Sequence, residues 1–158
     1  ECELYIKDEN GRNLGCRFQN VIIWDKSSYF LVDGSSKDSL IQFYDEYINL
    51  YEIEILTPPL NVTANCIGGS SGCIITWQTP LRSLVVEAHC FEYEVSIQKK
   101  VKAIYSFTYI HVRNNRYEFQ NYNKEKEYIL KIRARGMNCE LSSNWGEWSE
   151  PIEFGKTI

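Results

Sequence analysis

The sequence predicts an all-β protein composed of β-sandwiches, and three observations support this prediction. Eleven Tyr, seven Phe and four Trp among 158 residues are a heavy aromatic load, which is typical of β structure. Apolar and polar residues alternate in many short segments, whereas patterns with the period of a helix are scarce. Turn-rich segments separate these stretches. We therefore expect short strands paired in sheets.

Two segments in the second part of the chain alternate clearly. In CFEYEVSIQ, every second residue from Phe91 to Ile97 is apolar, and acidic or hydroxyl side chains lie between them. In EYILKIRAR, every second residue from Tyr128 to Ala134 is apolar and is expected to face inward. The opposite face of this second strand carries three cations at a period of two, namely Lys131, Arg133 and Arg135.

Five further segments complete a set of seven expected strands. They are LNVTANC (60–66), CIITWQTP (73–80), IYSFTYIHV (104–112), RYEFQ (116–120) and EPIEFG (150–155). Seven short strands over about one hundred residues have the number, size and spacing of an immunoglobulin-like or fibronectin-type sandwich.

A domain boundary is expected at Pro58-Pro59, because two prolines stop both a helix and a β ladder and form a stiff hinge. Residues 58–158 would then form one complete sandwich. Residues 1–57 contain only four strand-like runs, CELYIK, LGCRFQ, YFLVDG and LIQFYD, which are too few for a closed core of two sheets. We expect residues 1–57 to be the C-terminal half of another sandwich whose first half is absent.

Composition excludes several classes of function. The formal net charge of −4 leaves no electrostatic footprint for binding nucleic acid. No run of eighteen apolar residues is long enough to span a membrane. The chain opens at Glu1 without an initiator Met, which indicates a processed or excised piece, and any membrane anchor would lie outside it.

The six cysteines, Cys2, Cys16, Cys66, Cys73, Cys90 and Cys139, indicate an extracellular protein. None forms a C-x-x-C pair, and the only two histidines stand far from any zinc-binding pattern. Asn61-Val62-Thr63 is the one N-glycosylation sequon, so Asn61 is a candidate glycan site. Together these features favour the secretory route and three disulfides, for which sequence alone allows fifteen pairings.

An enzymatic function is not expected. His89 stands next to Cys90 and could suggest a thiol–imidazole pair, but a sulfur held in a disulfide is no nucleophile. His111 lies in a strand pattern without a motif. The sequence has no G-x-S-x-G, phosphate loop or H-E-x-x-H. We therefore predict no catalytic residues, no cofactor and no metal.

The stretch SSNWGEWSEP near the C-terminus places two tryptophans three residues apart. A strand would send Trp145 and Trp148 to opposite faces, and Gly146 and Pro151 argue against a helix. Polyproline II repeats every three residues, so both indoles would project from one side. They could then interleave with the cations of the strand 128–135. The simpler alternative is that these cations and indoles lie separately on the surface.

Residues Trp145-Gly146-Glu147-Trp148-Ser149 resemble the W-S-x-W-S signature of class I (haematopoietic) cytokine receptors, with Gly146 where Ser is usual. The resemblance implies that residues 58–158 are a membrane-proximal fibronectin type III domain. It also implies that the two tryptophans stack with arginines of the neighbouring strand, and Pro58-Pro59 looks like the interdomain linker of that family.

Further stretches resemble one subgroup, the receptor alpha chains for granulocyte–macrophage colony-stimulating factor, interleukin-three, interleukin-five and interleukin-thirteen. These include GRNLGCRF, IEILTPPLNVTANC, HCFEYEV and KIRAR. YFLVDGSSKDSLIQFYD, Cys66/Cys73 and PIEFG look most like the granulocyte–macrophage factor branch. Cys90 and Cys139 look more like the interleukin-five and interleukin-thirteen branches. The resemblance implies the pairings Cys2–Cys16, Cys66–Cys73 and Cys90–Cys139.

The same resemblance implies a four-helix cytokine bound at the elbow between two sandwiches, through residues 19–28, 80–89 and 136–144. The expected ligand contacts are Val21, Ile22, Ile23, Trp24, Arg82, Leu84, Val85, Val86, Met137, Glu140 and Leu141. The apolar run 21–24 could instead plug its own half-sandwich. A receptor cation is expected to meet an acidic residue of the cytokine, and we place Arg82 ahead of Arg135, which the tryptophans could occupy.

The function that the resemblance implies is recognition without chemistry. The chain would be an extracellular fragment of a receptor alpha chain that binds a cytokine and presents it to a shared signalling subunit. The alternative is a soluble decoy receptor, or an adhesion-type fibronectin module with no signalling role.

Overall fold

The computed structural model describes residues 1–22, 27–34, 37, 43–66, 72–82, 86–100 and 107–156. The chain separates into two compact units, Glu1–Ile48 and Asn49–Ile158. The second unit thus begins at Asn49, nine residues before the boundary expected at Pro58, because residues 49–57 pack against the second unit. Four-residue helix α1 (Leu50–Ile53) begins this segment, and its Tyr51 is buried.

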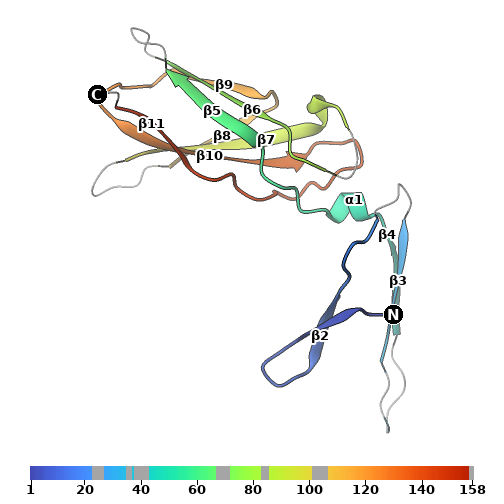
Figure 1. Ribbon diagram of the computed structural model, residues 1–158. Helices are drawn as coiled ribbons and strands as arrows, with labels where there is room; N and C mark the ends of the chain where they lie inside the picture. Colours follow the sequence, from blue (N-terminus) through green and yellow to red (C-terminus); the bar gives the residue numbers. More distant parts are fainter. Residues whose placement is uncertain are drawn as a thin grey trace. The chain divides into compact units, whose positions relative to one another are not determined.

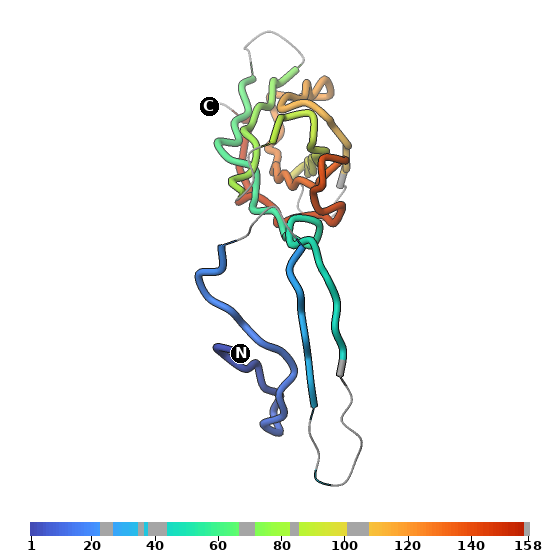
Figure 2. The backbone as a smooth tube through the Cα atoms, turned by 90° about the vertical axis from the view of Figure 1, so that its right-hand side faces the viewer, coloured from blue at the N-terminus to red at the C-terminus, as the bar shows by residue number. Residues whose placement is uncertain are grey.

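The first unit consists of two antiparallel hairpins at the four segments expected from the sequence (Figures 1 and 2). The strands are β1 (Leu4–Lys7) paired with β2 (Asn13–Arg17), and β3 (Ser28–Asp33) paired with β4 (Phe43–Ile48). None of the described residues of this unit is buried. Large apolar side chains are exposed on both hairpins, including Leu14 and Tyr47.

The second unit is a sandwich of two antiparallel sheets, which confirms the predicted fold class (Figure 1). One sheet has the order β5-β6-β9, with β5 (Leu60–Cys66), β6 (Cys73–Gln78) and β9 (Arg116–Phe119). The other has the order β11-β10-β7-β8, with β7 (Phe91–Lys99), β8 (Phe107–Val112), β10 (Glu127–Gly136) and β11 (Ile152–Gly155). A short 3-10 turn, Ala88–Cys90, precedes β7 and was not expected.

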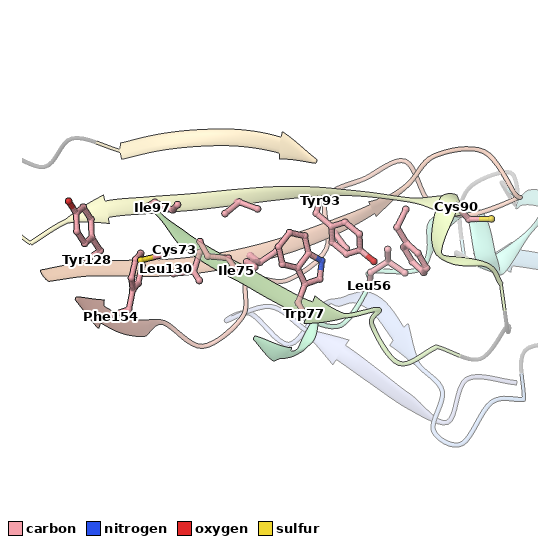
Figure 3. Close-up of a cluster of buried hydrophobic side chains, with 14 of the residues drawn as sticks. Leu56, Cys73, Ile75, Trp77, Cys90, Tyr93, Ile97, Tyr128, Leu130 and Phe154 are labelled. Atoms are coloured by element: carbon pink, nitrogen blue, oxygen red, sulfur yellow. The ribbon is translucent and has the colours of Figure 1, made fainter. Parts of the chain in front are cut away.

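The core of the sandwich lies between these two sheets (Figure 3). Along β10 every second residue is buried, which places Leu130 and Ile132 in the core with no exposed surface. Trp77 of β6 meets Tyr93 of β7 edge to face, with 5.2 Å between ring centroids. Burying each large apolar side chain contributes about 1.5–3 kcal/mol, so this layer supplies the main stabilising term.

Three disulfides join the pairs implied by the resemblance: Cys2–Cys16, Cys66–Cys73 and Cys90–Cys139. The first ties the N-terminal hairpin. The second links directly opposed residues of β5 and β6. The third ties the start of β7 to the loop that follows β10.

Candidate functional site

The stretch with the two tryptophans runs along the free edge of β10, beyond the end of β11. The Gly146 amide donates to the Ala134 carbonyl at 2.8 Å, and the Ser149 amide donates to the Ile132 carbonyl at 2.8 Å. The Ser149 hydroxyl accepts a hydrogen bond from the Ile132 amide at 3.0 Å. A step of three residues along the stretch thus matches a step of two residues along β10. The backbone groups at this edge of β10 are hydrogen-bonded to the stretch instead of to another strand.

Arginine and tryptophan side chains alternate above the outer face of β10. The Arg133 Cζ lies 5.2 Å from the Trp145 ring and 4.4 Å from the Trp148 ring. The Arg135 Cζ lies 4.5 Å from the Trp145 ring. The order is Trp148, Arg133, Trp145, Arg135, and we call these four residues the ladder. Each cation–π contact contributes about 0.5–2 kcal/mol.

Acidic residues of the adjacent strand β7 form ion pairs with both guanidinium groups. Glu94 lies directly opposite Arg133 in the sheet and accepts a hydrogen bond from its Nε at 2.6 Å. Glu92 lies opposite Arg135 and accepts from its Nε at 2.7 Å. Both carboxylates are only 11% exposed, so each buried charge has its counterion in the adjacent strand.

The neighbouring strand β8 extends this arrangement by two residues that the sequence reading did not assign to it. His111 lies opposite Glu94, with its Nε2 3.3 Å from the carboxylate, and its ring is 5.4 Å from that of Trp145. Tyr109 meets Trp148 at 6.4 Å between ring centroids. The only local signal is that Glu92 and Glu94 repeat at the same period of two as Arg133 and Arg135, and it becomes useful once the pairing of their strands is known.

One predicted member of the ladder is absent from it. Lys131 lies on the same outer face, opposite Ser96, but in the part of the chain that the structure describes it makes no cation–π contact. Trp148, the last ring of the ladder, lies over Arg133 and contacts Tyr109. The ladder and the carboxylates of Glu92 and Glu94 thus form a packed layer of charges and indoles, which is suited to stiffening a sheet rather than to catalysis.

The predicted ligand contacts of the first unit are only partly described. Val21 and Ile22 are 54% and 70% exposed in this unit of two hairpins. Ile23 and Trp24 lie outside the described residues. Two neighbouring apolar side chains in open solvent are consistent with a contact surface.

Arg82, the preferred cation for ligand contact, lies against the second unit's own core. Its Cζ is 4.7 Å from the Phe91 ring. Burial lowers the pKa of Arg82 and raises the pKa of Glu54, and the opposite charge of each group acts against the shift of the other. Both groups are part of the packing between the segment 49–57 and the sandwich, so Arg82 is half-buried rather than freely presented.

The remaining predicted contacts separate into exposed and buried residues. Glu140 is exposed and Met137 is half-exposed, as a contact surface requires. Leu141 is 7% exposed and belongs to the core, which removes it from the contact surface. Val86 packs against the same core, whereas Leu84 and Val85 lie outside the described residues.

The sequon residue Asn61 is exposed at the start of β5, an edge strand, and adopts φ +50°. Its Nδ2 donates to Gln78 Oε1 at 2.7 Å. The side chain therefore stands at the surface, where an attached glycan would replace this bond.

One group of residues in the described part of the chain has the composition of a metal site. Donor atoms of His89, Cys90 and Cys139 lie within 4.8 Å of one another. Both sulfurs are joined in a disulfide, so the cluster offers no thiolate ligand while that bond is intact.

The fold and the ladder define a class of protein, an all-β module with a fibronectin type III-like sandwich. No family model matches the chain. Its curated homologues are alpha chains of class I cytokine receptors. The human interleukin-5 receptor subunit alpha is 32% identical over 165 residues, covering 98% of this chain and 36% of the receptor.

Two further relatives give similar values. The human interleukin-13 receptor subunit alpha-2 is 30% identical and covers 95% of this chain and 38% of the receptor. The mouse granulocyte-macrophage colony-stimulating factor receptor subunit alpha is 27% identical and covers 90% and 36%. The chain thus spans little more than a third of these relatives. Cytokine receptors are not enzymes, in agreement with the predicted lack of catalytic activity.

Among the described residues, no helix has the length and apolar character needed to cross a membrane.

Proposed function

We propose that this chain is an extracellular, cytokine-binding part of a receptor alpha subunit that presents its ligand to a shared signalling subunit. The observation that carries the proposal is the extent of the similarity, because the human interleukin-5 receptor subunit alpha matches it at 32% identity along 98% of its length. The ladder supports the proposal. It fixes the sheet that bears the loop 136–144, and recognition by loops on a rigid scaffold is typical of binding domains.

The proposed ligand contacts comprise an apolar pair in the first unit and a more polar pair in the second unit. Val21 and Ile22 supply exposed apolar area, which is what interface centres contain. Met137 and Glu140 supply a second, more polar contact from the loop after β10. Arg82 contributes less than the sequence indicates, because it is half-buried against Phe91.

We also propose that the first unit is the C-terminal half of a larger sandwich. The absence of buried side chains among its described residues supports this, since a sandwich hides one face of each hairpin. Leu14, Leu31 and Tyr47 are all more than half exposed. A chain extended on its N-terminal side is expected to protect the amides of β1 to β4 from hydrogen exchange more strongly than residues 1–158 alone.

A binding titration tests the proposal. The secreted chain, extended to complete the first sandwich, is titrated with interleukin-5, interleukin-13 and granulocyte–macrophage colony-stimulating factor. These three cytokines are chosen from the names of the relatives. A variant with Val21→Ser and Ile22→Ser is measured in parallel. Ile55→Ser is the matched control, because Ile55 is 70% exposed, as Ile22 is, and belongs to the second unit, outside both the proposed contacts and the sandwich that the extension completes.

Binding of one cytokine, weakened at least tenfold by the double variant and unchanged in Ile55→Ser, is the expected result. A tenfold loss corresponds to about 1.4 kcal/mol, which is within the range of one interface anchor. A folded, disulfide-complete protein that binds none of the three would contradict the receptor proposal. Binding that the double variant leaves intact would contradict only the proposed surface.

A further inference from the structure

The Cys90–Cys139 disulfide has an imidazole against both of its sulfur atoms. His89 Nε2 lies 3.8 Å from Cys90 Sγ and 3.9 Å from Cys139 Sγ. The other ring nitrogen, Nδ1, lies 3.1 Å from a carboxylate oxygen of Glu87, which orients the ring toward the sulfurs. When Nε2 carries a proton, the carboxylate of Glu87 compensates the positive charge of the ring.

The two sulfur atoms differ in their access to solvent. Cys90 is 3% exposed and belongs to the core, whereas Cys139 is half-exposed in the loop after β10. An incoming thiolate therefore reaches Cys139 first. The sulfur of Cys90 would then be the leaving group, and it lies beside the proton donor.

The backbone around Cys139 is held in an unfavourable conformation. Asn138, Cys139 and Glu140 have φ values of +66°, +58° and +55°, so three successive residues with side chains are left-handed. This conformation is unfavourable for an ordinary L-residue, and less so for Asn. Opening the disulfide removes a covalent restraint on the centre of this turn.

The rest of the loop is anchored by contacts that do not involve the disulfide. The Gly136 amide donates to the Ser142 carbonyl at 2.6 Å, and the Met137 amide donates to the Cys90 carbonyl at 2.7 Å. Leu141 and Ser142 are buried. The change on opening would therefore be confined to residues 138–140, while the sandwich stays folded.

We propose that Cys90–Cys139 is a redox-sensitive disulfide, opened by an external dithiol with His89 as proton donor, and that its opening reshapes the loop 138–140. A thiolate of the dithiol attacks Cys139 Sγ and forms a mixed disulfide. The Cys90–Cys139 bond breaks, and its electron pair goes to Cys90 Sγ, which takes a proton from His89.

The second thiol of the reductant then closes its own disulfide and releases Cys139 as a thiol. Two electrons and two protons pass in total from the dithiol to the protein, and the His89 proton is restored from solvent. The reductant leaves oxidised.

The other two disulfides supply internal controls. Cys73, in the Cys66–Cys73 bond, has no exposed surface, and Cys2–Cys16 lies in the exposed N-terminal hairpin. The second histidine, His111, lies against Glu94 and Trp145. Of the three disulfides, only Cys90–Cys139 has an imidazole contact within the described residues.

The consequence for binding rests on the proposed function. Glu140 directly follows Cys139 and belongs to the proposed ligand surface, whereas Met137 keeps its hydrogen bond to the Cys90 carbonyl. Reducing this one bond would therefore change cytokine affinity without unfolding the receptor.

Partial reduction with dithiothreitol, followed by isotope-coded alkylation and peptide mass spectrometry, measures the opening rate of each disulfide separately. His89→Ala is expected to slow the opening of Cys90–Cys139 by roughly three- to tenfold, because leaving-group stabilisation governs thiol–disulfide exchange. The other two rates should not change. His111→Ala is the matched control and should leave all three rates unaltered.

An unchanged Cys90–Cys139 rate in His89→Ala would overturn the role of the imidazole. Near-ultraviolet circular dichroism of the Cys90→Ser/Cys139→Ser variant, which mimics the open form, should retain the native signal. Loss of that signal would show that the bond is purely structural and would overturn the proposal.

Titration of this open variant with the cytokine that binds the intact chain tests the consequence, and unaltered affinity would overturn the effect on the ligand surface. If the intact chain binds no cytokine, the proposed function fails, while the alkylation rates still decide the redox chemistry.

Discussion

Gly146, between the two tryptophans, lies in direct contact with Leu56 of the segment that precedes the sandwich. A β-carbon at position 146 would overlap the Leu56 carbonyl oxygen and lie 2.8 Å from the Leu56 β-carbon. The next amide, of Glu147, donates to the same Leu56 carbonyl at 2.9 Å. The glycine that departs from the W-S-x-W-S pattern is thus the residue that lets the segment 49–57 pack on the ladder.

Replacing Gly146 should therefore destabilise the second unit. Gly146→Ala is expected to lower the free energy of unfolding by about 1–3 kcal/mol, because backbone atoms must move to admit the methyl group. Urea unfolding followed by circular dichroism measures the change. Gly72→Ala is the control, since a β-carbon there would meet its nearest atom at 3.5 Å, an ordinary contact. Equal stabilities for the two variants would contradict the close packing of Gly146.

Removing one indole should weaken the ladder without touching the core. Trp148→Ala is expected to cost roughly 1–3 kcal/mol, since Arg133 loses one of its two stacking partners and Tyr109 loses a ring contact. The melting temperature and the amount of secreted protein should both fall, and Trp148→Phe should fall less. A Trp148→Ala protein that melts normally but loses its ligand would instead make the ladder a contact surface.

The pairing of Arg133 with Glu94 should be visible in a double-mutant cycle. Arg133→Met leaves a carboxylate that is 11% exposed without its main counterion, and should cost about 3–5 kcal/mol. Adding Glu94→Gln removes the stranded charge and should restore part of that loss. Unfolding free energies of the wild type, both single variants and the double variant measure the coupling. Additive losses would show that the two residues act independently.

Tyr93 should make the sandwich sensitive to alkaline pH. Burial raises the pKa of Tyr93 from 10.0 to about 12. Because the folded state favours the neutral phenol, the stabilisation is fully present below pH 10 and is lost as the pH rises to about 12. The total loss is about 3 kcal/mol, at about 1.4 kcal/mol for each pKa unit.

Urea unfolding at pH 9 and pH 11.5 measures this effect against Tyr93→Phe. The variant lacks the titrating group, although it also loses the hydrogen bond from Asn115 at both pH values. The stability advantage of the wild type should therefore shrink at the higher pH. A constant difference between the two proteins would contradict the link to Tyr93.

The strands were predictable from the sequence because alternation is a local signal. Each of the eleven strands in the described part of the chain overlaps an expected segment, although β4 continues three residues past LIQFYD to Ile48, and β10 buries every second residue as its pattern indicated. The stacking of Arg133 and Arg135 on the indoles was also predictable. Side chains on one face repeat every two residues in the strand and every three residues in the stretch beside it, so the two sets can interleave.

Features that depend on tertiary contacts were not predictable in the same way. Nothing local marks Leu56 as a core residue ahead of two prolines, since its burial depends on a stretch ninety residues later. Leu141 is the opposite case: the sequence suggested a ligand contact, and the side chain is buried in the core. An apolar residue in a loop can serve either purpose, and the sequence alone does not distinguish them. The counterions Glu92 and Glu94 required the pairing of β7 with β10 to be known first.

Strand β7 is shielded on both of its faces. The apolar core covers one side, and the charged and aromatic layer of the ladder covers the other, so even Glu92, Glu94 and Ser96 are buried. A substitution on this strand that alters the size or the charge of a side chain requires a matching substitution on β10 or β8. Three segments that are distant in the sequence are therefore expected to change together. Divergence in a protein of this design is therefore expected to accumulate in the loops, where ligand preference can shift while the shielded strand stays the same.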